Sequence, residues 1–158
     1  MKKALLFLDE HIEKIFISIM MGYFVVACLL QILFRFIIQK PASWTEETAR
    51  YAFIWMTFVG SSLGAKLLGH IRVDMLETSL GGRAKTILGI FSQTIFLIFA
   101  VVMTVVGIQM CMALVQRPQL SPALKIPMQY VYAAMPVGMG MMSMRIVRGL
   151  MSAFKGGK

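Results

Sequence analysis

Four long apolar runs, separated by short polar segments, dominate the chain. The first has no charged residue from Ile15 to Phe34, roughly 20 residues, which is enough to cross about 30 Å of hydrocarbon as a helix. The pattern predicts an all-α integral membrane protein with a single membrane domain, residues 1–158. We expect transmembrane helices over residues 15–38, 51–69, 86–116 and 126–147, with an interfacial helix over residues 43–50 between the first two.

The second and third runs differ from the usual length of a span. Residues 51–65 carry no charge, and Lys66 can extend its ammonium group toward the headgroups, so this helix can continue to Gly69. The third run has no charge over about 31 residues, too long for one perpendicular crossing and too short for two crossings and a turn. We expect one long helix there, tilted or protruding from the membrane.

Basic residues give the expected orientation. About 11 of the 16 Lys and Arg residues precede the first span, separate the second from the third, or follow the fourth. The other two connections carry about 5. The positive-inside rule therefore places both termini in the cytoplasm. Four basic side chains are expected to anchor helix ends among phospholipid headgroups: Arg35, Lys66, Arg145 and Arg148.

The segment before the first span has apolar and polar positions at helical spacing. It predicts either a short amphipathic helix on the membrane surface or a plain extension of the first span. Its apolar stretch is too short for a signal peptide, so we expect no processed leader. One face would carry Leu5, Leu8, Ile12 and Ile15, and the other Lys2, Asp9, Glu13 and Lys14.

The connection between the first two spans has the features of a helix start. Ser43 and Glu46 fit a capping box, and Glu46 and Glu47 suit the positive end of the helix dipole. Trp44 suits the headgroup layer. Arg50 can form one ion pair, with Glu46 at i,i+4 or Glu47 at i,i+3, contributing about 0.3–0.5 kcal/mol if exposed.

Composition excludes a water-soluble globule. Of the 158 residues, 58% are hydrophobic and 15% charged, against about 45–50% and 25% in soluble domains. A net charge of +9 would suggest nucleic acid as the partner of a soluble protein. Because the basic residues lie mainly between apolar runs, membrane topology explains them and we expect no nucleic-acid partner.

The search for catalytic, metal or cofactor chemistry is negative. His11 and His70 have no Cys or His at ligand spacing, and there is no glycine-rich phosphate loop. Cys28 and Cys111 lie inside apolar runs, which favours buried small side chains over a disulfide. We expect no enzymatic activity and no cofactor bound by this chain.

No Asp or Glu falls inside a predicted span. Ion-coupled transporters and proton relays usually place such groups near the middle of the membrane. The chain alone is therefore expected to be a poor transporter and to work with a partner.

The second span has the densest signal for helix packing. Gly60 and Gly64 form a small-xxx-small pair, and Trp55 and Phe58 add bulky surface one turn away. Packing within the chain and docking to another chain are equally compatible with this pattern.

In the fourth span, Pro136 removes a backbone donor and predicts a kink. Ala134, Gly138 and Gly140 beside it favour close helix approach over a gating hinge. The methionines around this span favour flexible filling of an interface over copper handling.

Three short motifs resemble the small membrane subunit of tripartite ATP-independent periplasmic (TRAP) transporters. They are W-x-E-E-x-x-R over residues 44–50, W-x-x-F-x-G over 55–60 and H-I-x-V-D over 70–74. The motifs cover about a fifth of the chain, and the length and four-span layout match over the rest.

The resemblance implies a heteromeric secondary transporter of a bacterial inner membrane. A periplasmic binding protein would deliver an organic acid such as sialic acid or a C4-dicarboxylate. A large elevator-type subunit would bind the acid and sodium, braced by the small subunit. The implied scaffold or interface positions are Glu47, Arg50, Trp55, Gly60, Gly64, His70 and Asp74, to which we add Trp44, Glu46 and Phe58 as candidates; none is expected to bind substrate.

Two other functions are weighed against this one. A stand-alone carrier or channel would need an acidic or histidine group within a span. The membrane anchor of a redox complex would need haem-ligating histidines near both membrane faces. The sequence has neither arrangement.

Overall fold

The protein consists of helices and loops throughout the part of the chain that the computed structural model describes, residues 2–40, 42–77 and 83–155. Side chains are described for residues 13–40, 42–65 and 89–151. The elements in chain order are α1 (Lys2–Phe36), α2 (Ser43–Glu77), α3 (Arg83–Gln116), the single turn α4 (Gln129–Tyr132) and α5 (Ala134–Lys155).

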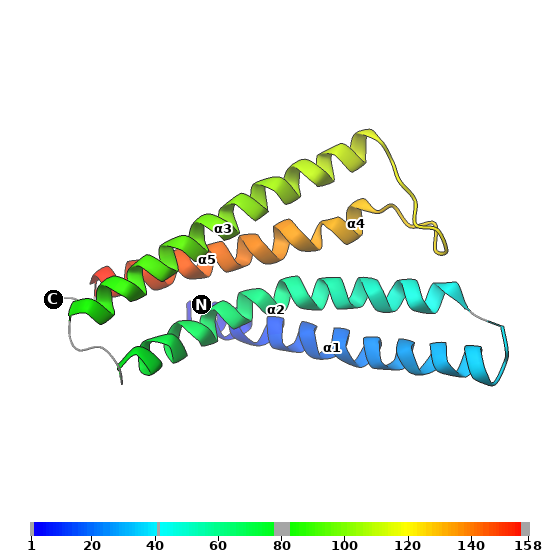
Figure 1. The fold of residues 1–158 in the computed structure, drawn as a ribbon, viewed down its shortest axis with the longest axis horizontal. Helices are drawn as coiled ribbons and strands as arrows, with labels where there is room; N and C mark the ends of the chain where they lie inside the picture. The colour runs from blue at the N-terminus through cyan, green and yellow to red at the C-terminus, as the bar shows by residue number, and fades with distance from the viewer. Residues whose placement is uncertain (1, 41, 78–82, 156–158) are drawn as a thin grey trace.

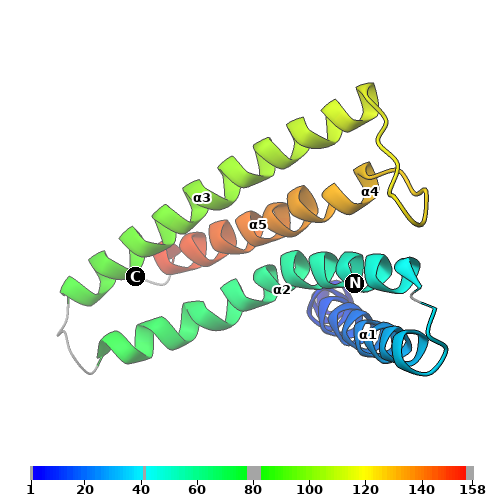
Figure 2. The ribbon, with the colours of Figure 1, turned by 45° about the vertical axis from the view of Figure 1, so that its right-hand side comes forward.

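The long helices form two antiparallel pairs placed side by side. α2 packs against α1 on one side and α5 on the other, and α3 packs along α5 (Figure 1). α1 and α3 therefore lie at opposite edges of the molecule, as Figure 2 also shows. The loops at residues 37–40 and 117–128 share one end of the molecule, whereas α2 and α5 finish and α3 begins at the other.

The helices join several segments that the sequence treats separately. α1 continues without interruption from Lys2, and α2 includes both the expected interfacial helix and the expected second span. The last helical segment is interrupted at Ala133, between α4 and α5. Because Pro136 has no N–H to donate to the carbonyl of Tyr132, one helical hydrogen bond is missing beside this interruption.

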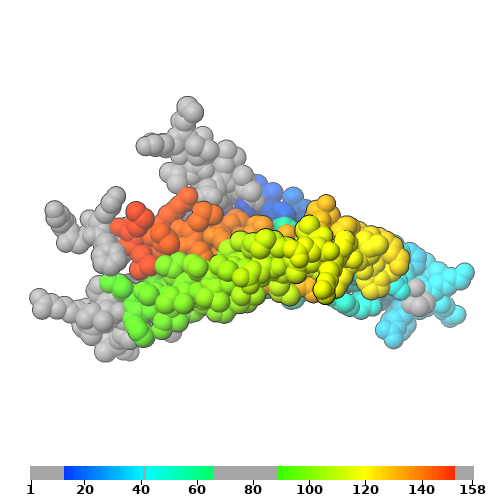
Figure 3. All heavy atoms as spheres, turned by 90° about the horizontal axis from the view of Figure 1, so that it is seen from above, coloured from blue at the N-terminus to red at the C-terminus, as the bar shows by residue number. Residues whose placement is uncertain are grey.

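Two of the described helices are long and apolar enough to cross a membrane, over Glu13–Phe36 in α1 and Gly89–Gln116 in α3. Large apolar side chains along both segments face outward, among them Ile19 and Leu29 on α1 and Ile98 on α3, each more than half exposed. Figure 3 shows α3 as a ridge along one edge of the molecule. Exposed apolar surface of this extent is consistent with a membrane protein.

The interior is thin and rich in small residues. Ala100, Met139 and Met142 form a buried cluster between α3 and α5, against which Phe58 of α2 packs. Edge-on and tilted aromatic pairs join α1 to α2, with ring centroids 5.8–6.2 Å apart. These pairs are Phe16–Trp55, Phe24–Phe53 and Phe34–Trp44.

Two glycines allow α5 to approach its neighbours closely. A Cβ atom on Gly138 would lie 2.3 Å from the carbonyl oxygen of Phe58 in α2. A Cβ atom on Gly107 of α3 would lie 2.8 Å from Cδ of Pro136. The close approach predicted beside Pro136 is thus confirmed at Gly138, where only a hydrogen fits.

Candidate functional site

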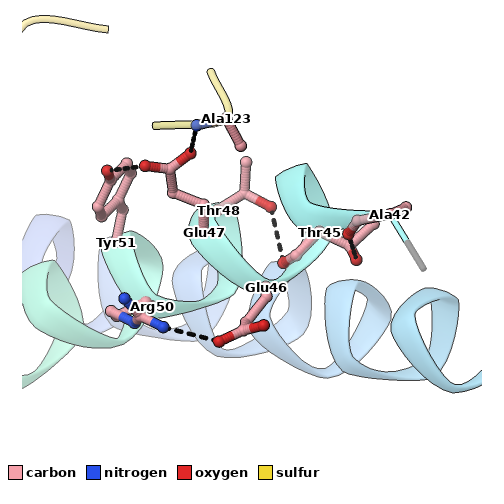
Figure 4. A network of polar contacts seen from close by, with 8 residues as sticks. All are labelled: Ala42, Thr45, Glu46, Glu47, Thr48, Arg50, Tyr51 and Ala123. Carbon is pink, nitrogen blue, oxygen red and sulfur yellow. Dashed lines mark hydrogen bonds and ion pairs between the residues drawn. The ribbon is translucent and has the colours of Figure 1, made fainter. Parts of the chain in front are cut away.

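A buried carboxylate near the start of α2 binds the 117–128 loop, which lies at the same end of the molecule. Glu47 is 7% exposed, and its Oε2 accepts hydrogen bonds from the backbone N–H groups of Ala123 and Leu124, both at 2.9 Å. The hydroxyl of Tyr51, one turn further along α2, donates to Oε1. We call these four residues, Glu47, Tyr51, Ala123 and Leu124, the Glu47 clamp; Figure 4 shows Glu47 with Tyr51 and Ala123.

The loop that the Glu47 clamp holds is itself folded back on itself. The N–H of Ser121 donates to the carbonyl of Ile126 and that of Met128 to the carbonyl of Gln119, both at 2.9 Å. Lys125 closes the turn with a positive φ of 56°. The side chain of Ser121 is fully buried. The loop is therefore a defined hairpin-like unit attached to α2.

The hydrogen bonds of the clamp favour the charged form of Glu47. Its pKa lies below the ordinary value, chiefly because of the Tyr51 hydroxyl, with burial opposing. The backbone N–H groups of Leu124 and Ala123 and the side chain of Ser121 lower the pKa further. Glu47 is thus a carboxylate at neutral pH, with Oε2 directed at the loop and Oε1 at Tyr51.

Glu46, next to Glu47, faces solvent and pairs with Arg50. Its Oε1 lies 2.7 Å from a guanidinium nitrogen of Arg50, and the two side chains are 58% and 62% exposed. The sequence allowed Arg50 to pair with either glutamate, and the structure has the i,i+4 pair. Because the pair is exposed, it contributes little to stability.

A second buried carboxylate lies near the opposite end of the molecule. Glu13 of α1 is 3% exposed, and its Oε2 lies 2.6 Å from a guanidinium nitrogen of Arg145 in α5. The hydroxyl of Ser62, on α2 between them, donates to Oε1 at 3.4 Å. The sequence pattern placed Glu13 on the face opposite Ile15; in the structure Ile15 is exposed, whereas Glu13 is buried against Ser62 of α2 and Arg145 of α5.

One face of α2 is open between its two neighbours. Glu46, Arg50, Phe53, Thr57, Gly60 and Gly64 follow one another at alternating spacings of four and three residues, which puts them on one side of the helix. The first four are exposed, and a Cβ atom on either glycine would meet nothing within 4 Å. Among the residues that the structure describes, nothing packs against Gly60 or Gly64 from within the chain, which was one of the two alternatives for this pair.

The other candidate residues are divided between the interior and the outside. Trp55 packs edge-on against Phe16, and the backbone of Phe58 meets Gly138. Trp44 is 43% exposed while it contacts Phe34. Arg35 is exposed and its guanidinium lies 5.9 Å from the Phe36 ring. Arg148 is exposed, and the side chains of Lys66, His70 and Asp74 lie outside the described residues.

Several members of these sites carried no recognised signal in the sequence. Tyr51 could have been found, because it lies four residues after Glu47 on the same face. Ser62 and Arg145 meet Glu13, and Ser121 meets Glu47, only through the tertiary fold. Among the residues searched in the structure, no group of three His, Cys, Asp or Glu side chains could hold a metal ion.

Comparison with known families gives a match over most of the chain. Residues 24–156 match the family described as tripartite ATP-independent periplasmic transporters, DctQ component. The matched region includes the Glu47 clamp, the open face of α2 and all of α3 and α5.

Individual relatives carry names of the same kind. The chain is 31% identical over 149 residues to the isethionate TRAP transporter permease protein DctMQ of Oleidesulfovibrio alaskensis, covering 90% of this chain and 24% of that protein. It is 24% identical to the C4-dicarboxylate TRAP transporter small permease protein DctQ of Rhodobacter capsulatus, covering 66% and 46%. It is 26% identical to the sialic acid TRAP transporter small permease protein SiaQ of Vibrio cholerae, covering 63% and 58%. The alignments thus span about a quarter of the first relative and about half of the others.

Proposed function

Because the chain belongs to the DctQ family of TRAP transporters, we propose that it is the small permease subunit of a sodium-coupled importer of an organic acid. In this proposal it braces the large membrane subunit and helps to seat a periplasmic binding protein, without binding substrate itself. Isethionate, C4-dicarboxylates and sialic acid, named for the relatives, are all organic acids. Because the relatives are named for different acids, we propose only the class of substrate, an organic acid.

The observation that supports the scaffold role is that the described acidic side chains bind other residues of this chain. Each of the three whose side chains the structure describes has partners within the chain: Glu13 has Arg145, Glu46 has Arg50, and Glu47 has the loop. Carboxylates that bind a transported ion need an approach from a water-filled path. Glu13 and Glu47 instead join helices and a loop, and Glu46 pairs with Arg50 on the surface of α2, which supports a static role.

The open face of α2 supports a docking surface for the large subunit. Helices in membranes associate where small and hydroxyl-bearing residues let backbones approach, and this face presents Thr57, Gly60 and Gly64 in succession. In the Oleidesulfovibrio relative, the matching region is about a quarter of a longer permease chain named DctMQ. This supports a large permease part as the neighbour of the region.

We further propose four membrane crossings in a bacterial inner membrane, with both termini cytoplasmic. The antiparallel order of α1, α2, α3 and α5 supports this arrangement, and so does the excess of Lys and Arg at one end. The Glu47 clamp then lies at the periplasmic end. There it would hold the loop in a fixed shape against which a binding protein can dock.

Copurification tests the proposed seam. Gly60→Leu or Gly64→Leu on the open face is expected to reduce recovery of the large subunit at least tenfold when the two chains are coexpressed. Gly22→Leu on α1 is the matched control, because its Cβ atom also meets nothing within 4 Å of this chain. Full recovery of the large subunit with both α2 variants would overturn the seam.

A further inference from the structure

An apolar groove runs between α3 and the α4–α5 segment at the end of the molecule that carries the 117–128 loop. Its volume is about 440 Å³, in the range of about 300–1,000 Å³ typical of small-molecule sites. Gln116 contributes the one amide side chain of the lining. The apolar lining includes Ile108, Cys111, Met112 and Val115 on one side and Pro136 and Val137 on the other.

The groove follows from a close helix crossing. At Gly107 and Pro136 the two helices touch, since a Cβ atom on Gly107 would lie 2.8 Å from Cδ of Pro136. Beyond this point the helices separate, as Figure 1 shows, and the residues that follow Gly107 line the space between them. The crossing therefore forms the closed end of the groove, and its mouth is at the end of α3.

The lining differs in kind from the open face of α2. Helix interfaces in membranes are rich in Gly, Ala, Ser and Thr, which let a second backbone approach. The groove instead presents long or branched side chains such as Ile108, Met112 and Val115. These adapt to a flexible chain and hold a second helix backbone at a distance, which favours lipid over a protein helix as the occupant.

The groove has the length of one leaflet of a bilayer, and basic residues lie at its mouth. From Ile108 to Gln116 the helix rises about 12 Å, close to half of the roughly 30 Å hydrocarbon thickness. Exposed Arg117 follows directly at the mouth, and the 117–128 loop also carries Lys125 and no acidic residue. An anionic headgroup at this level would be complementary in charge.

We propose that this groove binds one acyl chain of an anionic phospholipid, with the headgroup phosphate beside Arg117. The groove is separate from the open face of α2, where we propose that the large subunit docks, so lipid binding can be measured on this chain alone. The bound acyl chain would fill the space between α3 and α5 and so stabilise the packing of these two helices.

Native mass spectrometry of the full chain, released from phosphatidylglycerol or phosphatidylcholine nanodiscs, tests the proposal. We expect phosphatidylglycerol to remain bound after gentle removal of other lipid. Met112→Trp, which fills the groove, should lower this retention at least fivefold. Met110→Trp should leave it unchanged, because Met110 is exposed on the same helix and does not line the groove. Equal retention of phosphatidylglycerol by the two variants would overturn the proposed lipid site. A dimer that is lost only in Met112→Trp would also overturn it, because the groove would then bind a second copy of the chain.

Two further measurements do not depend on a bulky substitution. Cys111 lines the groove, so delipidation in detergent should raise its maleimide labelling at least threefold relative to Cys28 on α1, and added phosphatidylglycerol should reverse the change. Arg117→Gln should reduce the preference for phosphatidylglycerol over phosphatidylcholine, whereas Arg35→Gln should not. Labelling unaffected by lipid would contradict the acyl-chain site, and an unchanged preference in Arg117→Gln would contradict the headgroup assignment.

Discussion

The carboxylate of Glu13, near the start of the chain, lies 2.6 Å from the guanidinium of Arg145, near its end. The two residues come from α1 and α5, both of which pack against α2. The side chains are 4% and 13% exposed, so solvent screens the pair little. The ion pair therefore joins the two antiparallel helix pairs, with Ser62 of α2 beside it.

Replacing one residue of this pair should lower the free energy of unfolding more than replacing both. Arg145→Met alone leaves the buried Glu13 carboxylate without this guanidinium, and Glu13→Leu alone removes the carboxylate from a largely buried guanidinium; breaking a buried pair costs about 3–5 kcal/mol. The double variant Glu13→Leu/Arg145→Met should recover most of that loss. Thermal unfolding of the purified chain in detergent measures all three, with Glu46→Gln of the exposed pair as the control. Additive losses in the double variant would show that the two charges do not stabilise one another.

The Glu47 clamp should make the order of the 117–128 loop depend on pH. Because the folded-state pKa of Glu47 is lowered, its stabilisation is present above the ordinary value of 4.5 and is lost as pH falls from there through the folded-state pKa. Hydrogen exchange at the amides of Ala123 and Leu124, corrected for intrinsic rates, should show falling protection in that window. Glu47→Gln should reduce protection already at neutral pH, while Glu46→Gln should not. Equal protection in wild type and Glu47→Gln would rule out the carboxylate as the holding group.

The glycines of α2 and α5 should respond in opposite ways to the same substitution. Gly138→Ala forces a methyl group against the carbonyl of Phe58, which should destabilise the protein by about 1–3 kcal/mol. Gly60→Ala in the isolated chain meets no atom within 4 Å and should stabilise it by about 0.5–1 kcal/mol through helix propensity. Thermal unfolding of both variants checks the pair. Tolerance of Gly138→Ala would mean that the α2–α5 crossing is looser than the structure has it.

The helical architecture was predictable because long apolar runs leave few alternatives in a membrane. The start of α2 near Ser43 and the close approach of helices beside Pro136 were also predictable, although Glu46 bonds to Arg50 in the structure. The two buried carboxylates did not. Glu13 and Glu47 occupy positions that look polar and exposed along the sequence, and their partners lie far away in it. Which of two neighbouring glutamates pairs with Arg50 was likewise decided by the loop that binds Glu47.

The open face of α2 illustrates the same limit. The small-xxx-small pattern of Gly60 and Gly64 is compatible with a partner in the same chain or in another. The choice depends on where α1 and α5 pack, and they cover the other sides of α2. The local motif thus indicated close packing, whereas the arrangement of the helices determines that no described residue covers these two glycines.

In the proposed function, this chain supports transport that the large subunit performs. The most direct test is sodium-driven uptake of a radiolabelled organic acid into proteoliposomes, with binding protein supplied outside. We expect accumulation when this chain and the large subunit are reconstituted together, and none above empty vesicles with this chain alone. Sodium-dependent accumulation by this chain alone would contradict the proposed function.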